Sequence, residues 1–140
     1  MINKVQLFHA KFGLPLGKDD VLSNDKHAQE FRVKFLQEEL DELKEALDAC
    51  DRVKAFDALL DLTYVAYGTA LFMGVTPGMW HAGMDAVQKA NMAKVRVAKA
   101  EDSKRGSTFD VRKPEGWVGP EARLEEILSW EQLNLEGGLT

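Results

Sequence analysis

One aspartate, Asp61, lies alone in a long apolar stretch of the chain. It is the only aspartate, glutamate, lysine or arginine between Ala58 and Met84. An unpaired carboxylate buried in such a segment costs several kcal/mol or takes up a proton. Pairing with an arginine or lysine in the core would compensate for this cost, and so would a bound cation. The segment just upstream supports a bound cation.

That upstream segment is acidic and helical. Asp25 is a candidate N-cap for a helix from about Lys26 to Ala49. A stripe of leucines predicts the apolar face of this helix, and it consists of Leu36, Leu40, Leu43 and Leu47. Glu39 and Glu42, one turn apart, lie to one side of the stripe. Glu38 and Glu45 point away from it.

A short break at Cys50–Arg52 precedes a second helix, from Val53 to Gly74. Such a brief connection predicts an antiparallel helical hairpin. Glu42 is nine residues before Asp51 and Asp61 is ten residues after it, so the two carboxylates stand nearly level at ~1.5 Å rise per residue. Acidic helices are commonly just solvated faces, but this alignment favours a metal site. The expected ligands are Glu39, Glu42, Asp57 and Asp61, whose oxygens suit Mg²⁺ or Mn²⁺.

The rest of the chain also reads as helices separated by turns, without alternating strands. We expect an all-α bundle of four to five helices over residues 1–100 and an irregular C-terminal arm over 101–140. The expected further helices are 3–12, ended by Gly13, one from Gly78 or Met79 to near Ala100, and a short one from Pro120 to Trp130. Frayed residues are expected from Leu135 to Thr140.

The helix expected from Gly78 or Met79 to near Ala100 carries a group of polar residues, Lys89, Asn91 and Lys94. Lysines on a helix are usually surface decoration. Next to a magnesium site they become candidates for binding the remaining charge of a polyphosphate, and Asn91 for a phosphate, sugar or base. Asp85 lies one turn before Lys89 and is a candidate outer metal ligand or a salt-bridge partner of Lys89, with the salt bridge slightly favoured.

Composition excludes several other functions. The net charge of −5 argues against general nucleic-acid binding. The apolar run after Asp61 is far short of the ~20 residues that cross a bilayer. No signal peptide is visible, and the single Cys50 suits a reducing cytoplasm. His9 and His81 are isolated, so zinc is not expected. Aromatic residues are expected mainly in the core; these are Phe8, Phe12, Tyr64, Tyr67 and Trp80.

The acidic pattern Glu38-Glu39-x-x-Glu42, followed by Asp57-x-x-x-Asp61, resembles that of the all-α (MazG-like) nucleoside triphosphate pyrophosphohydrolases, which include phosphoribosyl-ATP pyrophosphohydrolase. Ala58 stands where the superfamily usually has a glutamate, and Asp57 is the candidate replacement. Three further segments resemble the phage-type branch of this superfamily. They are Phe8-His9-x-x-Phe12-Gly13, Tyr64-Val-x-Tyr-Gly68 and Lys89-Ala-Asn91-Met-x-Lys94.

The resemblance implies magnesium-dependent cleavage of a (deoxy)nucleoside triphosphate to the monophosphate and diphosphate. Glu38 would orient or deprotonate the attacking water. A purine substrate such as dGTP or dATP is favoured, because the chain lacks the extra helices of dimeric dUTPases. Relatives form homodimers or homotetramers. The resemblance also implies a cytoplasmic protein, which is in the host cytoplasm if a phage encodes it. The alternatives are a non-catalytic acidic adaptor protein, or a dUTP or phosphoribosyl-ATP pyrophosphohydrolase.

Overall fold

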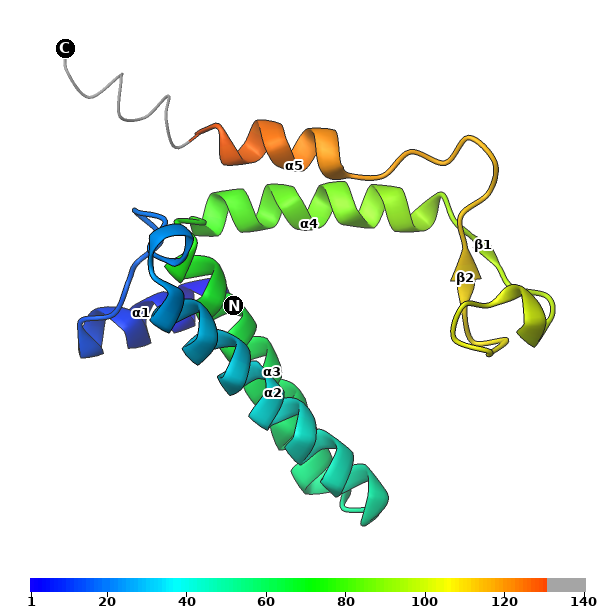
Figure 1. The fold of residues 1–140 in the computed structure, drawn as a ribbon, viewed down its shortest axis with the longest axis horizontal. Coiled ribbons are helices and arrows are strands. Elements are labelled where there is room, and N and C mark those ends of the chain that lie inside the picture. The colour runs from blue at the N-terminus through cyan, green and yellow to red at the C-terminus, as the bar shows by residue number, and fades with distance from the viewer. Residues whose placement is uncertain (131–140) are drawn as a thin grey trace. The chain divides into compact units, whose positions relative to one another are not determined.

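The computed structural model describes residues 1–130, which are mainly helical (Figure 1). These residues contain five α-helices and one two-stranded sheet, which confirms the expected all-α class. The expectation for Leu135–Thr140 lies outside the described residues. The helices are α1 (Ile2–Phe12), α2 (Lys26–Asp48), α3 (Arg52–Phe72), α4 (Pro77–Met92) and α5 (Glu121–Leu128); the strands are β1 (Val95–Arg96) and β2 (Val111–Arg112); short 3-10 turns cover Leu22–Asn24 and Ala100–Asp102.

The chain divides into two compact units, Met1–Trp80 and the part from His81 onward. The first unit holds α1, α2 and α3, and the second holds most of α4 together with β1, β2 and α5. Within residues 1–130, no helix is both long and apolar enough to span a lipid bilayer.

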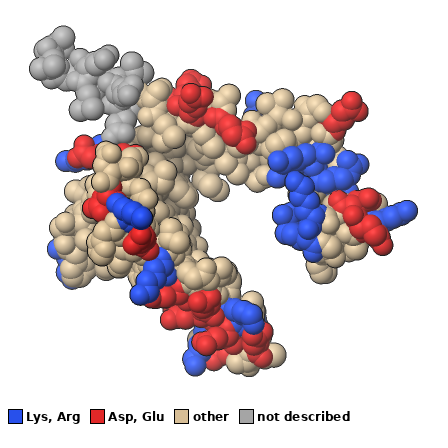
Figure 2. Space-filling model, in the orientation of Figure 1, with Lys and Arg blue, Asp and Glu red and all other residues tan. Residues whose placement is uncertain are grey.

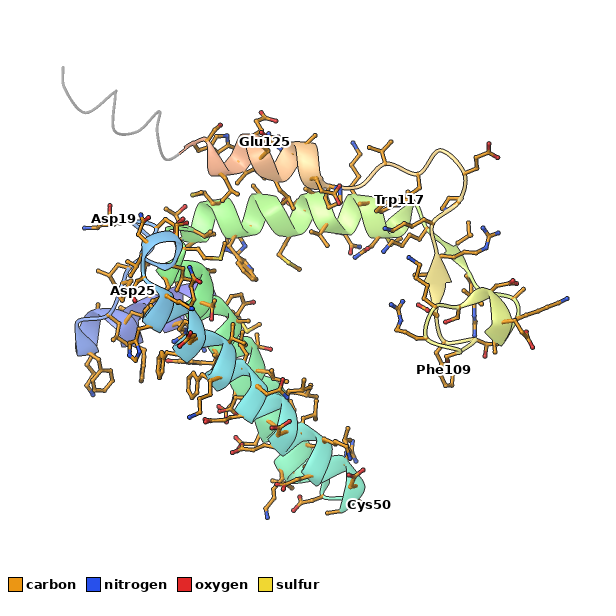
Figure 3. The ribbon with its side chains drawn as sticks, viewed as in Figure 1. Asp19, Asp25, Cys50, Phe109, Trp117 and Glu125 are labelled. Atoms are coloured by element: carbon orange, nitrogen blue, oxygen red, sulfur yellow. The ribbon has the colours of Figure 1, made fainter. Side chains whose placement is uncertain are left out.

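Local capping sets the ends of the first-unit helices. α1 ends at Gly13, whose φ of 68° is a left-handed conformation that glycine adopts without strain. The carboxylate of Asp25 accepts a hydrogen bond from the backbone N–H of Ala28 at 2.9 Å and begins α2. Asp51 begins α3 in the same way, through the N–H of Lys54 at 3.0 Å. These caps confirm the predicted hairpin, whose turn lies at Cys50 (Figure 3).

The helices α2 and α3 lie side by side and antiparallel, and α1 packs against α3 (Figure 1). The core of this unit is formed by apolar residues that α1 and α3 turn inward. Among the most deeply buried are Ile2 and Val5 from α1, and Val65 and Leu71 from α3. Burial of these side chains, at roughly 25 cal/mol per Å² of apolar surface, holds the unit together.

The leucine stripe of α2 faces this core only in part, since Leu36 and Leu43 are half-buried. Leu40 is 48% exposed and Leu47 is 60% exposed. The face of α2 that is turned toward α3 instead carries the buried Arg32 and Ala46, with Glu39 midway between them. The inward face of α2 is therefore offset from the predicted leucine stripe, and Leu40 and Leu47 form part of an apolar surface that a single chain leaves uncovered.

The second unit also differs from the sequence prediction. α4 ends at Met92 and not near Ala100, because the chain after it turns to form β1. Two short antiparallel strands pair here, with Val95 opposite Arg112, in a region where no strand was predicted. Asp110 fixes the loop between them by accepting a hydrogen bond from Ser103 at 2.7 Å. Hydrogen bonds from Ser103 and Arg105 lower the pKa of Asp110 to about 2.

Candidate metal and nucleotide site

The buried guanidinium of Arg32 fixes how α2 and α3 are aligned. It donates hydrogen bonds to the carbonyl oxygen of Val65 at 2.7 Å and to the hydroxyl of Thr69 at 3.1 Å. Glu39 follows Arg32 by two helical turns on the same face of α2. Because the helices are antiparallel, Glu39 lies opposite a part of α3 that is about two turns before Val65 and Thr69, the partners of Arg32. That position is where Asp57 and Asp61 stand.

The charges of three other carboxylates act on Glu39 at this position. Burial raises the pKa of Glu39, and so do the negative charges of Glu42, Asp61 and Asp57. All three neighbours were predicted as co-ligands from the sequence. Red side chains gather toward the turn of the hairpin, with blue ones among them (Figure 2).

Glu39 carries a buried carboxylate oxygen without a hydrogen-bond partner, which is unusual in a folded protein. This atom is Oε2, and none of the described residues donates to it. A buried acceptor without a donor destabilises a fold by ~1–3 kcal/mol. None of the salt bridges between described residues involves Glu39 or Asp61, so pairing of Asp61 with an arginine or lysine does not occur there.

These residues fit a hard divalent cation in their chemistry. The donor set is oxygen only, and its negative charges repel one another without a cation. Within residues 1–130, no three carboxylate, imidazole or thiol groups already stand at metal-binding positions.

Glu38 lies outside this group. It is exposed on α2, and its charge is not among those that raise the pKa of Glu39. It lines a shallow outward-facing hollow with Gln37 and Asp41. Glu38 and Glu42 are four residues apart and therefore share one exposed side of the helix.

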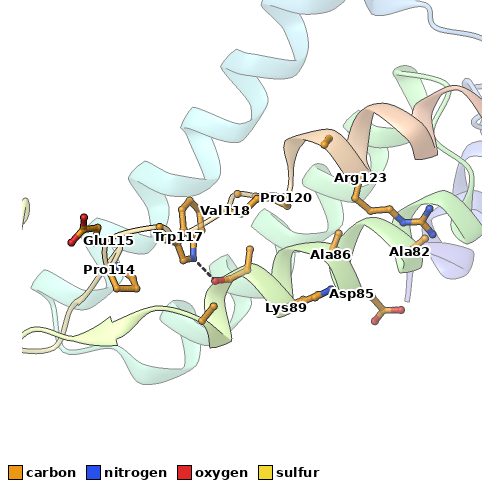
Figure 4. Close-up of a pocket in the computed structure, with 15 residues that line it drawn as sticks. Ala82, Asp85, Ala86, Lys89, Pro114, Glu115, Trp117, Val118, Pro120 and Arg123 are labelled. Carbon is orange, nitrogen blue, oxygen red and sulfur yellow. Dashed lines mark hydrogen bonds between the residues drawn. The ribbon is translucent and has the colours of Figure 1, made fainter.

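The predicted phosphate-binding residues belong to the second unit. Lys89 is exposed and lines a cavity of about 840 Å³ between α4 and the segment 114–123 (Figure 4). Asn91 is exposed near the end of α4. Lys94 lies beyond the helix, with its ammonium 5.3 Å from the ring centre of Trp117. Lys89 and Asn91 therefore belong to α4, whereas Lys94 lies outside the helix that was predicted to include all three.

The wall of this cavity is held in place by Trp117. Its indole N–H donates a hydrogen bond to the carbonyl oxygen of Ala90 at 2.7 Å (Figure 4). Asp85 and Lys89 both line the cavity, but the predicted salt bridge between them is not formed in the structure. The ammonium of Lys89 thus remains free of carboxylate partners among the described residues.

The sequence analysis missed a buried polar cluster formed by Arg32, His9 and Gly68. The ring of His9 is bonded through Nδ1 to the carbonyl oxygen of Pro15 at 2.6 Å. Burial lowers the pKa of His9 and of Arg32, and the nearby guanidinium charge lowers that of His9 further. Gly68 lies against both side chains. A glycine in an otherwise apolar helix was the available signal, because such a residue often marks a close approach.

Comparisons with known proteins bear on residues 5–91. This range matches the family model of phosphoribosyl-ATP pyrophosphohydrolase. The match covers more than half of the chain and includes Glu38, the four clustered carboxylates, Lys89 and Asn91, but it ends before Lys94. A search of curated proteins found no match to the chain.

Proposed function

The chain belongs to the phosphoribosyl-ATP pyrophosphohydrolase family, within the MazG-like superfamily, and is thus a nucleotide pyrophosphohydrolase; we propose that it cleaves (deoxy)nucleoside triphosphates with the help of Mg²⁺. The reaction is (d)NTP + H2O to (d)NMP + diphosphate, with purine deoxynucleotides such as dGTP or dATP as the preferred substrates. The enzyme acts on the nucleotide pool of the cytoplasm.

One observation carries this proposal. Glu39 has a buried oxygen without a donor, and the negative charges of Glu42, Asp57 and Asp61 act on it. A fold that serves only as scaffold gains nothing from four unneutralised carboxylates at one place. The cluster therefore supports Mg²⁺ binding, with these four side chains as ligands and Mn²⁺ as an acceptable substitute.

A bound Mg²⁺ supplies positive charge that stabilises the charge developing on the phosphoryl oxygens. The protein side chains do the rest. Glu38 accepts the proton of the attacking water at its carboxylate, because it is exposed and shares one side of α2 with Glu42. The water attacks the α-phosphorus, and diphosphate leaves. The polyphosphate and the nucleoside are bound by the ammonium groups of Lys89 and Lys94 and by the side-chain amide of Asn91.

The apolar surface of α2 and α3 supports assembly with a second copy of the chain. A single subunit exposes several large apolar side chains along this hairpin, more than a monomer usually leaves in water. A homodimer, or a homotetramer built from dimers, would cover them. The exposed residues include Leu40, Leu47, Val53, Phe56 and Leu60.

Phosphoribosyl-ATP is the second candidate substrate. The matching family model favours it, because the family is named for this activity. It would undergo cleavage at the same bond, next to the nucleotide monophosphate, and would require an additional contact for its ribosyl phosphate. The carboxylate cluster serves both substrates equally, so only a comparison of substrates separates them.

The experiment is a substrate panel with the full chain. Ribo- and deoxynucleoside triphosphates, dUTP and phosphoribosyl-ATP are incubated with Mg²⁺, and diphosphate and orthophosphate are measured separately. We expect diphosphate as the product, released fastest from purine deoxynucleotides. Orthophosphate as the main product would overturn the pyrophosphohydrolase mechanism. Faster cleavage of phosphoribosyl-ATP would replace the proposed substrate with the second candidate. A protein without hydrolytic activity that still binds other proteins would be an adaptor.

A further inference from the structure

Aromatic rings lie at the surface beside the carboxylate cluster, and two of them, Phe8 and Tyr64, had been predicted as core residues. Tyr64 is 38% exposed and Phe8 is 42% exposed. Phe35 is half-buried and its neighbour Phe31 is half exposed. Exposed aromatic rings are costly to leave in water, so a group of four beside a candidate active site calls for an occupant.

Phe35 and Tyr64 have matched positions relative to the carboxylates. Phe35 precedes Glu39 by four residues on α2, so the two share a face. Tyr64 follows Asp61 by three residues on α3 and shares a face with it in the same way. Because α2 and α3 are antiparallel, both rings are displaced from the carboxylates toward the same end of the hairpin, by one turn. They border the cluster on one side.

Each of these two rings is supported by another ring. Phe31 stacks on Phe35 with ring centres 5.9 Å apart and an angle of 13° between the planes. Phe8 meets Tyr64 in an edge-to-face contact, with centres 5.6 Å apart and an angle of 88°. Phe8 is anchored through its neighbour His9, which is buried and bonded to Pro15. The supported rings lose little freedom when a ligand binds.

We propose that Phe35 and Tyr64 form the subsite for the purine base of the nucleotide whose phosphates bind at Glu39 and Asp61. This inference rests on the proposed function. Bases stack on aromatic side chains through their flat faces, and a purine offers a larger face than a pyrimidine. The subsite adjoins the carboxylates directly, and one nucleotide can therefore occupy both.

The test compares a ligand that has a base with one that lacks it. The probes are the non-hydrolysable α,β-imido analogue of dGTP and inorganic tripolyphosphate, each titrated calorimetrically with Mg²⁺ into the full-length protein. Phe35→Leu and Tyr64→Leu remove a ring and keep an apolar side chain. Tyr64→Phe keeps the ring. Phe109→Leu is the matched control, because Phe109 is 96% exposed in the second unit. Subunit assembly is measured for every variant by light scattering.

We expect each ring-removing variant to weaken binding of the dGTP analogue about tenfold, without changing its affinity for tripolyphosphate. Tyr64→Phe and Phe109→Leu should bind both probes like the unmodified protein. Equal weakening of both probes, unchanged binding of the analogue, failure of the unmodified protein to bind it, or dissociation of the subunits would overturn the subsite. Dissociation would assign the rings to an interface between copies.

The outcome is separable from that of the proposed function. A protein that binds the analogue through both rings but releases no diphosphate from any nucleotide would refute the proposed reaction and keep the subsite. A protein that cleaves dGTP equally well without either ring would refute the subsite alone.

Discussion

A guanidinium nitrogen of Arg32 lies 2.6 Å from the point where a Cβ atom on Gly68 would stand. The ring of His9 is 2.9 Å from the same point. No real Cβ atom tolerates such distances, so α3 can pass this close to the buried cluster only with glycine at this position. The close approach holds α1, α2 and α3 in the alignment that places Asp61 beside Glu39.

Gly68→Ala is therefore expected to destabilise the protein by ~2–3 kcal/mol, since the added methyl group must displace a buried guanidinium. Thermal unfolding with and without Mg²⁺ measures the loss. The matched control is Gly78→Ala in α4, where the nearest atom to an added Cβ is 4.0 Å away. There the better helix propensity of alanine should leave the melting temperature unchanged or raise it. Equal destabilisation by both substitutions would contradict the assigned role of Gly68.

Asp61→Asn should abolish diphosphate release, by a factor of ~10³ or more, because the ligand charge is lost while the shape is kept. The folded structure should persist, since none of the hydrogen bonds or salt bridges found in residues 1–130 depends on Asp61. Circular dichroism and activity are measured on the same sample. Mg²⁺ should no longer raise the melting temperature of this variant. Normal Mg²⁺ stabilisation would place the cation elsewhere.

Glu38→Gln separates proton transfer from metal binding. If Glu38 accepts the proton of the attacking water, kcat should fall ~10²–10⁴-fold while the Mg²⁺ concentration for half-maximal activity changes little. Glu45→Gln is a suitable control, because Glu45 is an exposed glutamate of the same helix. Parallel losses of kcat and Mg²⁺ affinity would make Glu38 a ligand.

Glu39 predicts an inverse dependence of stability on pH in the metal-free protein. The pKa of Glu39 is raised by burial and by neighbouring carboxylates. The folded state therefore binds its proton more tightly than the unfolded state does. This contribution to stability is present below the ordinary glutamate pKa of 4.5 and is lost as pH rises through the higher value in the folded protein.

In EDTA at neutral pH, Glu39→Gln should thus unfold at a higher temperature than the unmodified protein, by ~1 kcal/mol of stability. Addition of Mg²⁺ at a hundredfold excess over its dissociation constant should reverse the order, since a ligand at that level stabilises its protein by ~2.7 kcal/mol. Chemical denaturation at several pH values provides the free energies. A Glu39→Gln protein that is less stable than the unmodified one in EDTA would contradict this account.

His9 predicts the opposite response to acid. Burial lowers its pKa below the ordinary 6.5, so the unfolded state binds the proton first. The resulting stability is complete above pH 6.5 and is lost as pH falls toward the lower pKa of the folded protein. His9→Gln should flatten the fall in unfolding free energy between about pH 7 and 5, whereas substitution of the exposed His81 by Gln should not.

Much of the fold was predictable because its signals are local. Asp25 and Gly13 set helix ends through contacts within one turn, and the structure confirms both predictions. The four carboxylates could be aligned by counting from the hairpin turn. Features that depend on distant residues were missed: β1 forms only because β2 pairs with it, and Arg32 is buried only because Gly68 leaves room for it. Phe8, Phe12 and Tyr64 lie at the surface although they were predicted in the core, because apolar character alone does not bury a residue. Tyr67 and Trp80 are half-buried.

The hydrogen bond from Trp117 to Ala90 has a practical consequence for protein production. A shortened version that stops at the end of the family match would leave the carbonyl of Ala90 without its donor. It would also remove the residues of 114–123 that line the cavity opposite Ala82, Ala86 and Ala90 of α4. Such a fragment would be prone to aggregate, and any loss of catalysis in it would say nothing about the chemistry. Expression of the whole polypeptide is therefore the sound starting point for every assay.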